Sequence, residues 1–229
     1  MTALSILFED GEALVIDKPA GLPLDPPRAG GRSLENYLED LKLGFQRPPA
    51  PVHRLDQDTS GCLLLARNPK ALKRFSAAFE AREVEKVYLG IVDGLLEQDE
   101  GTISLSLAKI SSAEKGWRMI AAKKGKPSVT HWRKVAVHGP HTLVEFRPET
   151  GRTHQIRIHA LAGLGKPLLG DPIYGTGKGA PRTMLHASAL TVARGEKPPV
   201  AARAPLPQDF IALGFTDPAG EPTPPPTGS

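Results

Sequence analysis

Hydrophobic and polar positions along this chain fall into short blocks that predict a series of strands. Residues 62–66 form a continuous apolar run, which is typical of a strand that is buried on both faces. Residues 141–151 alternate instead, so that Val144 and Phe146 are expected to share one face of a strand. Another strand is predicted over residues 86–94. Residues 13–22 begin as a short apolar strand that ends in a turn at Lys18-Pro19 and Gly21.

Three segments carry the apolar spacing and the end signals of helices. Ser33 is predicted to be the N-cap of the first helix. Asn68 is predicted to cap the second, in which apolar residues recur at i, i+3 and i+7. Thr153 is expected to cap the third, and Gly163 or Gly165 is expected to end it.

Strands and helices do not alternate regularly along the chain. This order predicts an α+β fold with a mixed, largely antiparallel central sheet flanked by helices. We expect one catalytic domain over residues 1–217. Residues 218–229 are rich in Pro and small polar residues and are predicted to be a disordered tail.

Composition narrows the class of protein. The 229 residues contain no apolar run of about 18 residues, so that no membrane span is predicted. The single cysteine, Cys62, cannot form an internal disulfide, and the start of the chain carries acids where a secretory signal would be basic. We therefore expect a cytoplasmic protein, and a monomer.

Positive charge is concentrated in one part of the chain. The formal net charge is only +4, but residues 105–135 contain eight basic residues against one acid, Glu114. A solvated face explains such a segment, and so does a surface that binds a polyanion. The basic residues are Lys109, Lys115, Arg118, Lys123, Lys124, Lys126, Arg133 and Lys134.

Two charged stretches flank predicted secondary structure. Asp56 and Asp58 stand just before the apolar run at residues 62–66, where a carboxylate must be paired, hydrogen-bonded or catalytic. For Asp58 we favour a turn-capping role. The second stretch, residues 152–157, places Arg, His and Gln side chains at a predicted strand-to-helix junction, where donors can converge on an anion.

Three other patterns do not predict a functional site. The stretch GDPIYGTGKG has the glycine spacing of a phosphate-binding loop, but Thr176 stands where the chemistry needs a lysine. His154 and His159 are five residues apart and lack the surroundings of a zinc helix, so that no metal site is predicted. Cys62 is expected to be a small core residue.

The charged stretches resemble the RluA family of RNA pseudouridine synthases, whose signature reads HRLDxxTSG followed by an apolar strand. The resemblance extends over nearly the whole chain in the expected order. The RNA-binding S4 module of many relatives is not expected, so that the catalytic domain would hold the RNA itself. The matching stretches are VIDKPAGL (15–22), HRLDQDTSG (53–61), KVYLGIV (86–92), GRTHQIRIH (151–159), LLGDPIYG (168–175), MLHASAL (184–190) and ARAPLPQDF (202–210).

This resemblance implies an isomerase that converts uridine in RNA to pseudouridine without a metal or another cofactor. Asp56 is then expected to be the catalytic carboxylate. Arg157 is expected to be its bidentate partner, and Tyr88 to pack on the uracil and to accept a proton from the sugar.

The resemblance also implies residues that hold a flipped-out uridine and its RNA. Arg54 is expected to fill or guard the vacated space in the RNA, while His53 supports the turn by hydrogen bonding. Lys123, Lys124 and Lys126 become candidates for an RNA-gripping hairpin. Residues expected to hold the turn and the RNA backbone are Arg152, His154 and Gln155. The implied substrates are structured RNAs, either tRNA or a stem-loop of large-subunit rRNA.

Two alternatives stay open from the residues alone. A glycosidase would need a second carboxylate beside Asp56, and only Asp58 is near in sequence. A non-catalytic RNA-binding protein would tolerate the loss of Asp56, Tyr88 or Arg157. All three are present, which favours the enzyme.

Overall fold

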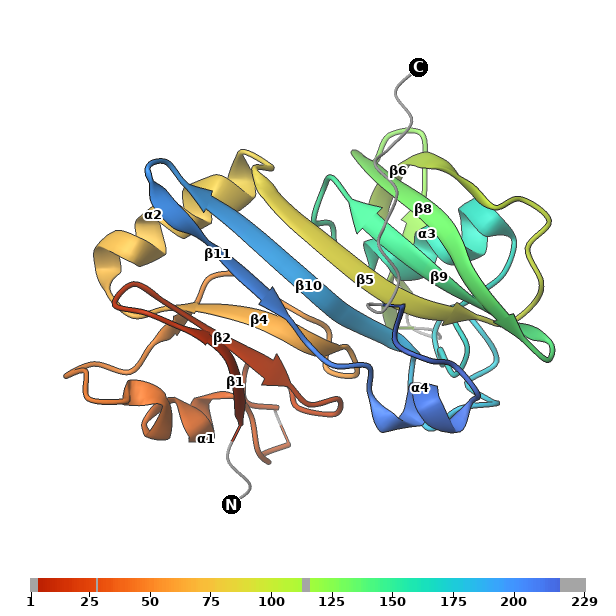
Figure 1. The fold of residues 1–229 in the computed structure, drawn as a ribbon. Helices are drawn as coiled ribbons and strands as arrows, with labels where there is room; N and C mark the ends of the chain where they lie inside the picture. The colour runs from red at the N-terminus through yellow and green to blue at the C-terminus, as the bar shows by residue number, and fades with distance from the viewer. Residues whose placement is uncertain (1–3, 28, 113–115, 219–229) are drawn as a thin grey trace.

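The computed structural model describes residues 4–27, 29–112 and 116–218. Within these residues one sheet of eleven strands runs through the whole molecule (Figure 1). Its strands are β1 (Ser5–Glu9), β2 (Ala13–Lys18), β3 (Ala50–Pro51), β4 (Ser60–Ala66), β5 (Val84–Val92), β6 (Glu100–Ser112), β7 (Gly116–Ala121), β8 (Lys126–His138), β9 (His141–Pro148), β10 (Leu185–Arg194) and β11 (Lys197–Arg203).

The sheet is almost entirely antiparallel. Its order is β1-β2-β4-β10-β5-β9-β8-β6-β7, with β3 paired to β4 and β11 paired to β10. Among the described strands, only β10 and β4 run parallel, where His186 lies opposite Ser60. This pairing joins the N-terminal half of the sheet to the half that carries β5 to β9. The predicted α+β fold with a mixed, largely antiparallel sheet is confirmed.

The helices are short, apart from two. Those of the described residues are α1 (Glu35–Leu38), η1 (Asp40–Lys42, a 3-10 helix), α2 (Pro69–Glu80), α3 (Gln155–Leu164) and α4 (Gln208–Ala212). The prediction for α2 is confirmed, because the Asn68 side chain accepts a hydrogen bond from the Ala71 N–H at 2.8 Å.

The predicted caps of the other two helices are wrong. Leu34, not Ser33, is the N-cap of α1, and the Ser33 N–H donates to the side chain of Asn36 at 2.8 Å. His154, not Thr153, is the N-cap of α3, with a left-handed φ of 53°. Both starts are set by tertiary packing, since Leu34 is fully buried and the side chain of Gln155 organises the loop before α3. Gly165 ends α3, as predicted.

Apolar side chains cover both faces of the sheet. In β4 all seven residues are buried, as the continuous apolar run predicts. In β9, Val144 and Phe146 pack beneath α3, while Leu143 lies in the cluster of α4 on the other face. Tyr88 of β5 contacts the cluster beneath α3 and also the cluster around α1. The middle of β5 is therefore where the two halves of the molecule meet.

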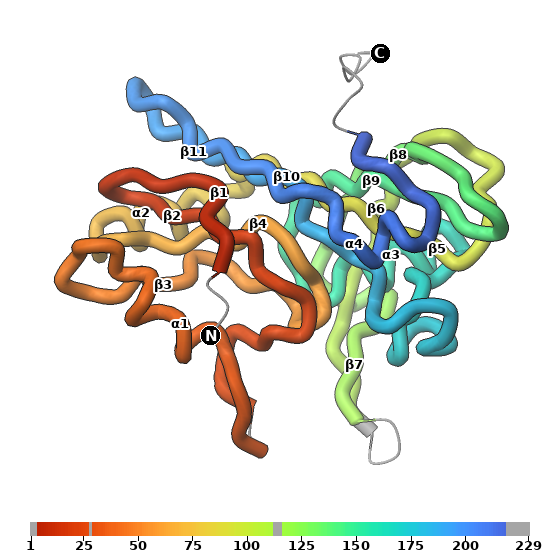
Figure 2. The backbone as a smooth tube through the Cα atoms, turned by 60° about the horizontal axis from the view of Figure 1, so that its bottom comes forward, coloured from red at the N-terminus to blue at the C-terminus, as the bar shows by residue number. Residues whose placement is uncertain are grey.

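Two segments extend from the body of the molecule. Figure 2 shows the β6–β7 hairpin projecting to the same side as the loop that follows β2. No helix of the described residues is long and apolar enough to cross a membrane. The predicted tail at residues 218–229 lies outside the described residues, apart from Pro218.

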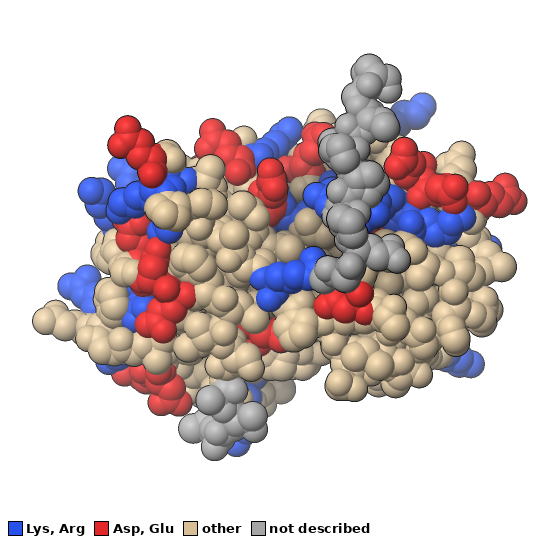
Figure 3. Space-filling model, viewed as in Figure 1, with Lys and Arg blue, Asp and Glu red and all other residues tan. Residues whose placement is uncertain are grey.

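Basic and acidic side chains are interspersed on the face drawn in Figure 3, which is viewed as in Figure 1. Several cations around Glu12 form close ion pairs with acids. Arg74 lies 2.8 Å from Glu12, and Lys197 lies 3.1 Å from the same carboxylate. These cations therefore do not add unpaired positive charge to the surface.

Candidate active site

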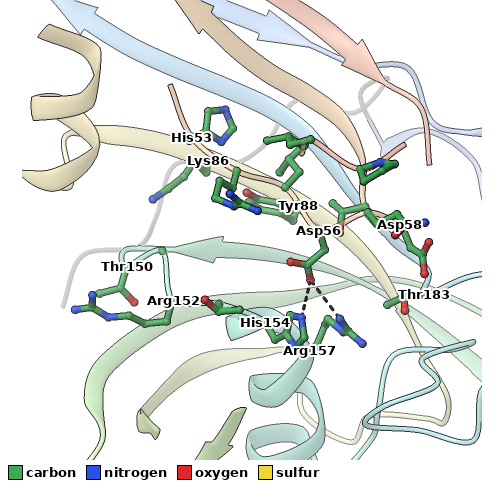
Figure 4. Close-up of a pocket in the computed structure, with 18 of the residues that line it drawn as sticks. His53, Asp56, Asp58, Lys86, Tyr88, Thr150, Arg152, His154, Arg157 and Thr183 are labelled. Atoms are coloured by element: carbon green, nitrogen blue, oxygen red, sulfur yellow. Dashed lines mark hydrogen bonds and ion pairs between the residues drawn. The ribbon is translucent and has the colours of Figure 1, made fainter. Parts of the chain in front are cut away.

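A pocket of about 950 Å³ opens between the loop after β2, the end of α2, the start of α3 and strand β7. Asp56, Tyr88 and Arg157 line it together, although Asp56 and Arg157 are 101 residues apart in the sequence (Figure 4). The structure thus brings together the three residues that the sequence predicts to be catalytic.

A tight turn presents Asp56 to the pocket. The Thr59 N–H donates to the Asp56 carbonyl oxygen at 3.1 Å and closes the turn. Gly61, the second residue of β4, has a φ of 105°, and an added Cβ would lie 2.2 Å from the Ala187 carbonyl oxygen of β10. Only glycine fits this approach. The Thr-Ser-Gly part of the motif therefore serves to bring the turn against β10.

Two buried cations hold the backbone of this turn. Lys18 is fully buried and its Nζ donates to three carbonyl oxygens, one of them that of Gln57 at 2.9 Å. Burial lowers the pKa of Lys18 to about 8. Arg182 donates to the Asp58 carbonyl oxygen at 2.8 Å and pairs with Asp209 at 2.6 Å. Consecutive carbonyl groups after Asp56 are thus fixed from inside the protein.

The capping role predicted for Asp58 is wrong. Its carboxylate accepts no hydrogen bond from any of the described residues, and the Thr59 N–H goes to a backbone oxygen instead. The Asp58 charge acts on Lys18, whose pKa it raises against the larger effect of burial. The turn is stabilised by hydrogen bonds from Lys18 and Arg182 instead of by the expected Asp58 cap.

Arg157 contacts Asp56, but its main partner is another carboxylate. Its Nη1 lies 3.3 Å from Asp56 Oδ2. Its Nε and Nη2 bind Asp171 in a bidentate pair at 2.7 and 2.8 Å, and Asp171 is fully buried. Burial acts to raise the pKa of Asp171, but the hydrogen bonds and charge of Arg157, together with the backbone N–H groups of Ile173 and Tyr174, hold that pKa below its usual value. The contact with Asp56 is as predicted, whereas the bidentate pairing with Asp56 is wrong.

His154 is the second group beside Asp56. Its Nε2 lies 3.8 Å from Asp56 Oδ2, as the dashed line in Figure 4 marks. Its Nδ1 lies 2.8 Å from the Tyr174 hydroxyl, which already accepts the Met119 N–H at 3.0 Å. The hydrogen bond between Nδ1 and the phenol fixes the His154 ring, so that Nε2 faces Asp56. Burial lowers the pKa of His154, which favours the neutral ring.

Strand β7 reaches the site through the same histidine. Trp117 stacks on His154 with ring centres 5.2 Å apart, and 48% of its surface remains exposed. Lys109 of β6 lies 5.0 Å above the Trp117 ring. Trp117 therefore presents a partly exposed aromatic ring to the pocket, next to the basic side chain of Lys109.

Tyr88 is half-buried and lies across the pocket from Arg157 (Figure 4). Burial raises the pKa of its phenol far above the usual range, and the nearby charge of Asp56 raises it further. The hydroxyl is therefore protonated at neutral pH.

Three further residues that the sequence predicts for the site are His53, Arg54 and Gln155, and each lies in a different environment. His53 accepts the Leu64 N–H at 3.0 Å and stacks on Phe79, and burial lowers its pKa to about 3. Arg54 is largely exposed and pairs with Asp25 at 2.8 Å. Gln155 is buried and its amide bonds to groups of β8 and of its own loop. His53 and Gln155 are thus committed to protein contacts.

Arg152 and the three lysines are oriented toward solvent. Arg152 lines the pocket and donates to the Pro127 carbonyl oxygen at 3.4 Å. Lys123 and Lys124 form the exposed turn between β7 and β8, and Lys126 is the first residue of β8. None of the three lysines is among the described residues that line the pocket.

The sequence matches the family model described as RNA pseudouridylate synthase over residues 12–162. An uncharacterized RNA pseudouridine synthase of Zymomonas mobilis is 56% identical over 215 residues, which cover 93% of this chain and 98% of the relative. The chain belongs to the RNA pseudouridylate synthase family.

Other members of this family agree in sequence and in fold. The ribosomal large subunit pseudouridine synthase D of Nitrosomonas europaea is 37% identical over 92% of this chain and 64% of its own length. The solved structure of human RNA pseudouridylate synthase domain containing 4 superposes with a TM-score of 0.76 over 91% of each chain, at 24% identity. The predicted resemblance is confirmed, and the protein is an isomerase that acts on RNA.

Three residues around Asp56 are missing from the sequence-based prediction of the site. Asp171 and Tyr174 lie in the matched stretch LLGDPIYG, where an acid before a proline marks a turn held by its side chain. Trp117 is an aromatic residue within the basic segment, a pattern typical of nucleic-acid surfaces. Their contacts with His154 and Arg157 depend on tertiary structure.

Proposed function

We propose that this pseudouridine synthase converts specific uridines of structured RNA to pseudouridine with Asp56 as its essential catalytic residue. One observation carries the proposal. The Asp56 side chain is 32% exposed in the pocket, while Arg157 and His154 both approach its Oδ2 atom (Figure 4). A fixed cation thus holds the carboxylate, which stays open to substrate.

The reaction is an isomerisation, so that no co-reactant is consumed. The C1′–N1 bond breaks, the uracil turns, and C1′ bonds to C5; the hydrogen on C5 leaves and N1 gains one. Asp56 acts as a nucleophile, either at the sugar or at the uracil ring. Arg157 orients the carboxylate because its own position is fixed by Asp171.

Tyr88 is proposed to pack on the uracil and to take part in proton transfer. Its ring lies between two core clusters and is well fixed. Because its pKa is raised, the phenol can accept a proton from the sugar only when it passes its own proton on. This makes Tyr88 a relay in the proposal.

Target uridines inside a stem must leave their stack to reach Asp56. Arg54, which is exposed at the rim, is proposed to occupy the vacated space after exchanging its Asp25 partner. Arg152 is proposed to bind RNA phosphate at the rim, and His154 to bind the substrate inside the pocket. Lys123, Lys124 and Lys126 are proposed to contact phosphates farther along the RNA.

Large-subunit rRNA is the substrate favoured by similarity to enzymes named ribosomal large subunit pseudouridine synthase D, and tRNA is the second candidate. We propose a cytoplasmic monomer; the burial of Cys62 fits a reducing compartment.

Product analysis tests the reaction. Unmodified transcripts of large-subunit rRNA and of tRNA, labelled in uridine, are incubated with the protein and digested to nucleosides. Pseudouridine is the expected product. Release of free uracil would indicate a glycosidase, and unchanged uridine in both RNAs would contradict the proposal.

A further inference from the structure

The end of the pocket nearest α2 carries two cations that no role above uses. Arg82 and Lys86 both line the pocket there. Neither side chain has a hydrogen bond or an ion pair with any group in the described part of the chain, although Lys86 is half-buried. By contrast, Arg74, Arg194 and Lys197 are all paired with acids.

The two cations also act on each other unfavourably. Burial lowers the pKa of Lys86, and the charge of Arg82 lowers it further. Glu80 lines the same end of the pocket but forms no ion pair with either of them in the described structure. Two like charges held together in a partly dry pocket are stabilised when an anion binds between them.

The backbone of Arg82 holds a left-handed conformation that glycine usually supplies. Helix α2 ends in a Schellman motif, in which the Glu83 N–H donates to Ala78 and the Arg82 N–H donates to Phe79. Arg82 occupies the left-handed position, with a φ of 63°, where glycine is usual. An arginine at this strained position is explained by what its side chain does at the rim of the pocket.

Strand register places this site one nucleotide unit from the reaction centre. Lys86 and Tyr88 are two residues apart on β5, so that their side chains share a face and lie about 7 Å apart along the strand. Only a ribose separates a base from its own phosphate. A uridine that packs its base on Tyr88 therefore brings a phosphate to Lys86.

We infer that Arg82 and Lys86 together bind the phosphate that flanks the target uridine. A planar guanidinium suits two phosphate oxygens, and the lysine adds a point charge. Fixing this phosphate holds the sugar of the flipped nucleotide against Asp56. This inference rests on the proposed function, because it takes the occupant of the Tyr88 pocket to be an RNA uridine.

The test measures binding of a short fluorescent oligouridylate to the full-length protein over a range of salt concentrations. Arg82→Gly and Lys86→Gln are each expected to weaken binding by about tenfold. The double variant should flatten the salt dependence by about 0.7, the slope of one single-strand phosphate contact, because both cations serve one phosphate. Each single variant should flatten it by no more than this amount, because the remaining cation still faces the phosphate.

Two controls separate this role from a structural one. Lys73→Gln removes the same charge from an exposed position of α2 outside the pocket and should change neither affinity nor slope. Arg82→Gly should unfold at the same or a higher temperature than the parent, because glycine suits the left-handed position.

A parental salt slope in the double variant would overturn the inference, and so would a double variant whose slope falls by about twice the single-phosphate value. Conversion of the rRNA and tRNA transcripts is measured separately. If the parent binds the oligouridylate but converts no uridine, the proposed function fails while the phosphate site stands.

Discussion

Two side chains beside Asp56 are positioned by residues that do not line the pocket. Arg157 is placed by Asp171, and the His154 ring is held by its hydrogen bond with Tyr174. Sequence similarity could assign Asp56 and Arg157 to one site because each lies in its own motif. It could not show that the bidentate partner of Arg157 is Asp171, because that pairing is decided by which carboxylate is fully buried.

The Arg157–Asp171 pair gives a prediction about stability and pH. Pairing depresses the folded pKa of Asp171 below the unfolded value of about 3.9, so that its stabilisation exists above that value and is lost as pH falls. Arg157→Met should lower the free energy of unfolding by about 3 kcal/mol near neutrality and by less in acid. Urea unfolding across a pH series measures this.

A double-mutant cycle identifies the partner of Arg157. Coupling of Arg157→Met with Asp171→Asn should exceed its coupling with Asp56→Asn, since Asp171 makes two short bonds and Asp56 one longer contact. A larger coupling to Asp56 would show that Asp56, not Asp171, is the main anchor of Arg157.

Tyr88 gives a prediction that separates chemistry from recognition. Tyr88→Phe keeps the ring that is proposed to pack on the uracil and removes the hydroxyl. We expect the single-turnover rate to fall roughly 100-fold, with little change in RNA affinity. Weak binding combined with a normal rate in the bound complex would make the hydroxyl a recognition group.

Elements whose limits are encoded locally were predictable from the sequence. Helix α2 has its cap, its proline and its apolar spacing within one segment, and β4 is a single apolar run. The starts of α1 and α3 were not, because buried Leu34 and the hydrogen bonds of Gln155 set them. The basic segment was visible as charge, but its division into β6, β7 and β8 was not.

The turn between β7 and β8 is the element that tests RNA gripping. Replacing Lys123, Lys124 and Lys126 together by Gln should weaken RNA binding and flatten its salt dependence. The slope should fall by roughly one for each duplex phosphate that a lysine neutralises in the parent. Folding stability should hardly change, since all three side chains are exposed. A parental salt slope would show that these lysines are only a solvated face.

At the scale of the whole molecule, the site depends on how two halves of one sheet are joined. The parallel pairing of β10 with β4 brings the Asp56 turn over β5, and α3 approaches from the other half. The order of motifs along the chain predicted the family and the fold class. The pairing of strands distant in sequence, and with it the shape of the pocket, needed the structure.

The central claim is that Asp56 performs the chemistry, and a single-turnover assay tests it most directly. Asp56→Asn and the matched variant Asp58→Asn are compared with the parent, at saturating enzyme, on an RNA transcript that the parent converts. Asp56→Asn should bind the RNA and form no detectable pseudouridine, while Asp58→Asn should react at close to the parental rate. A rate for Asp56→Asn within about tenfold of the parent, which is about 1.4 kcal/mol in the barrier, would contradict the account.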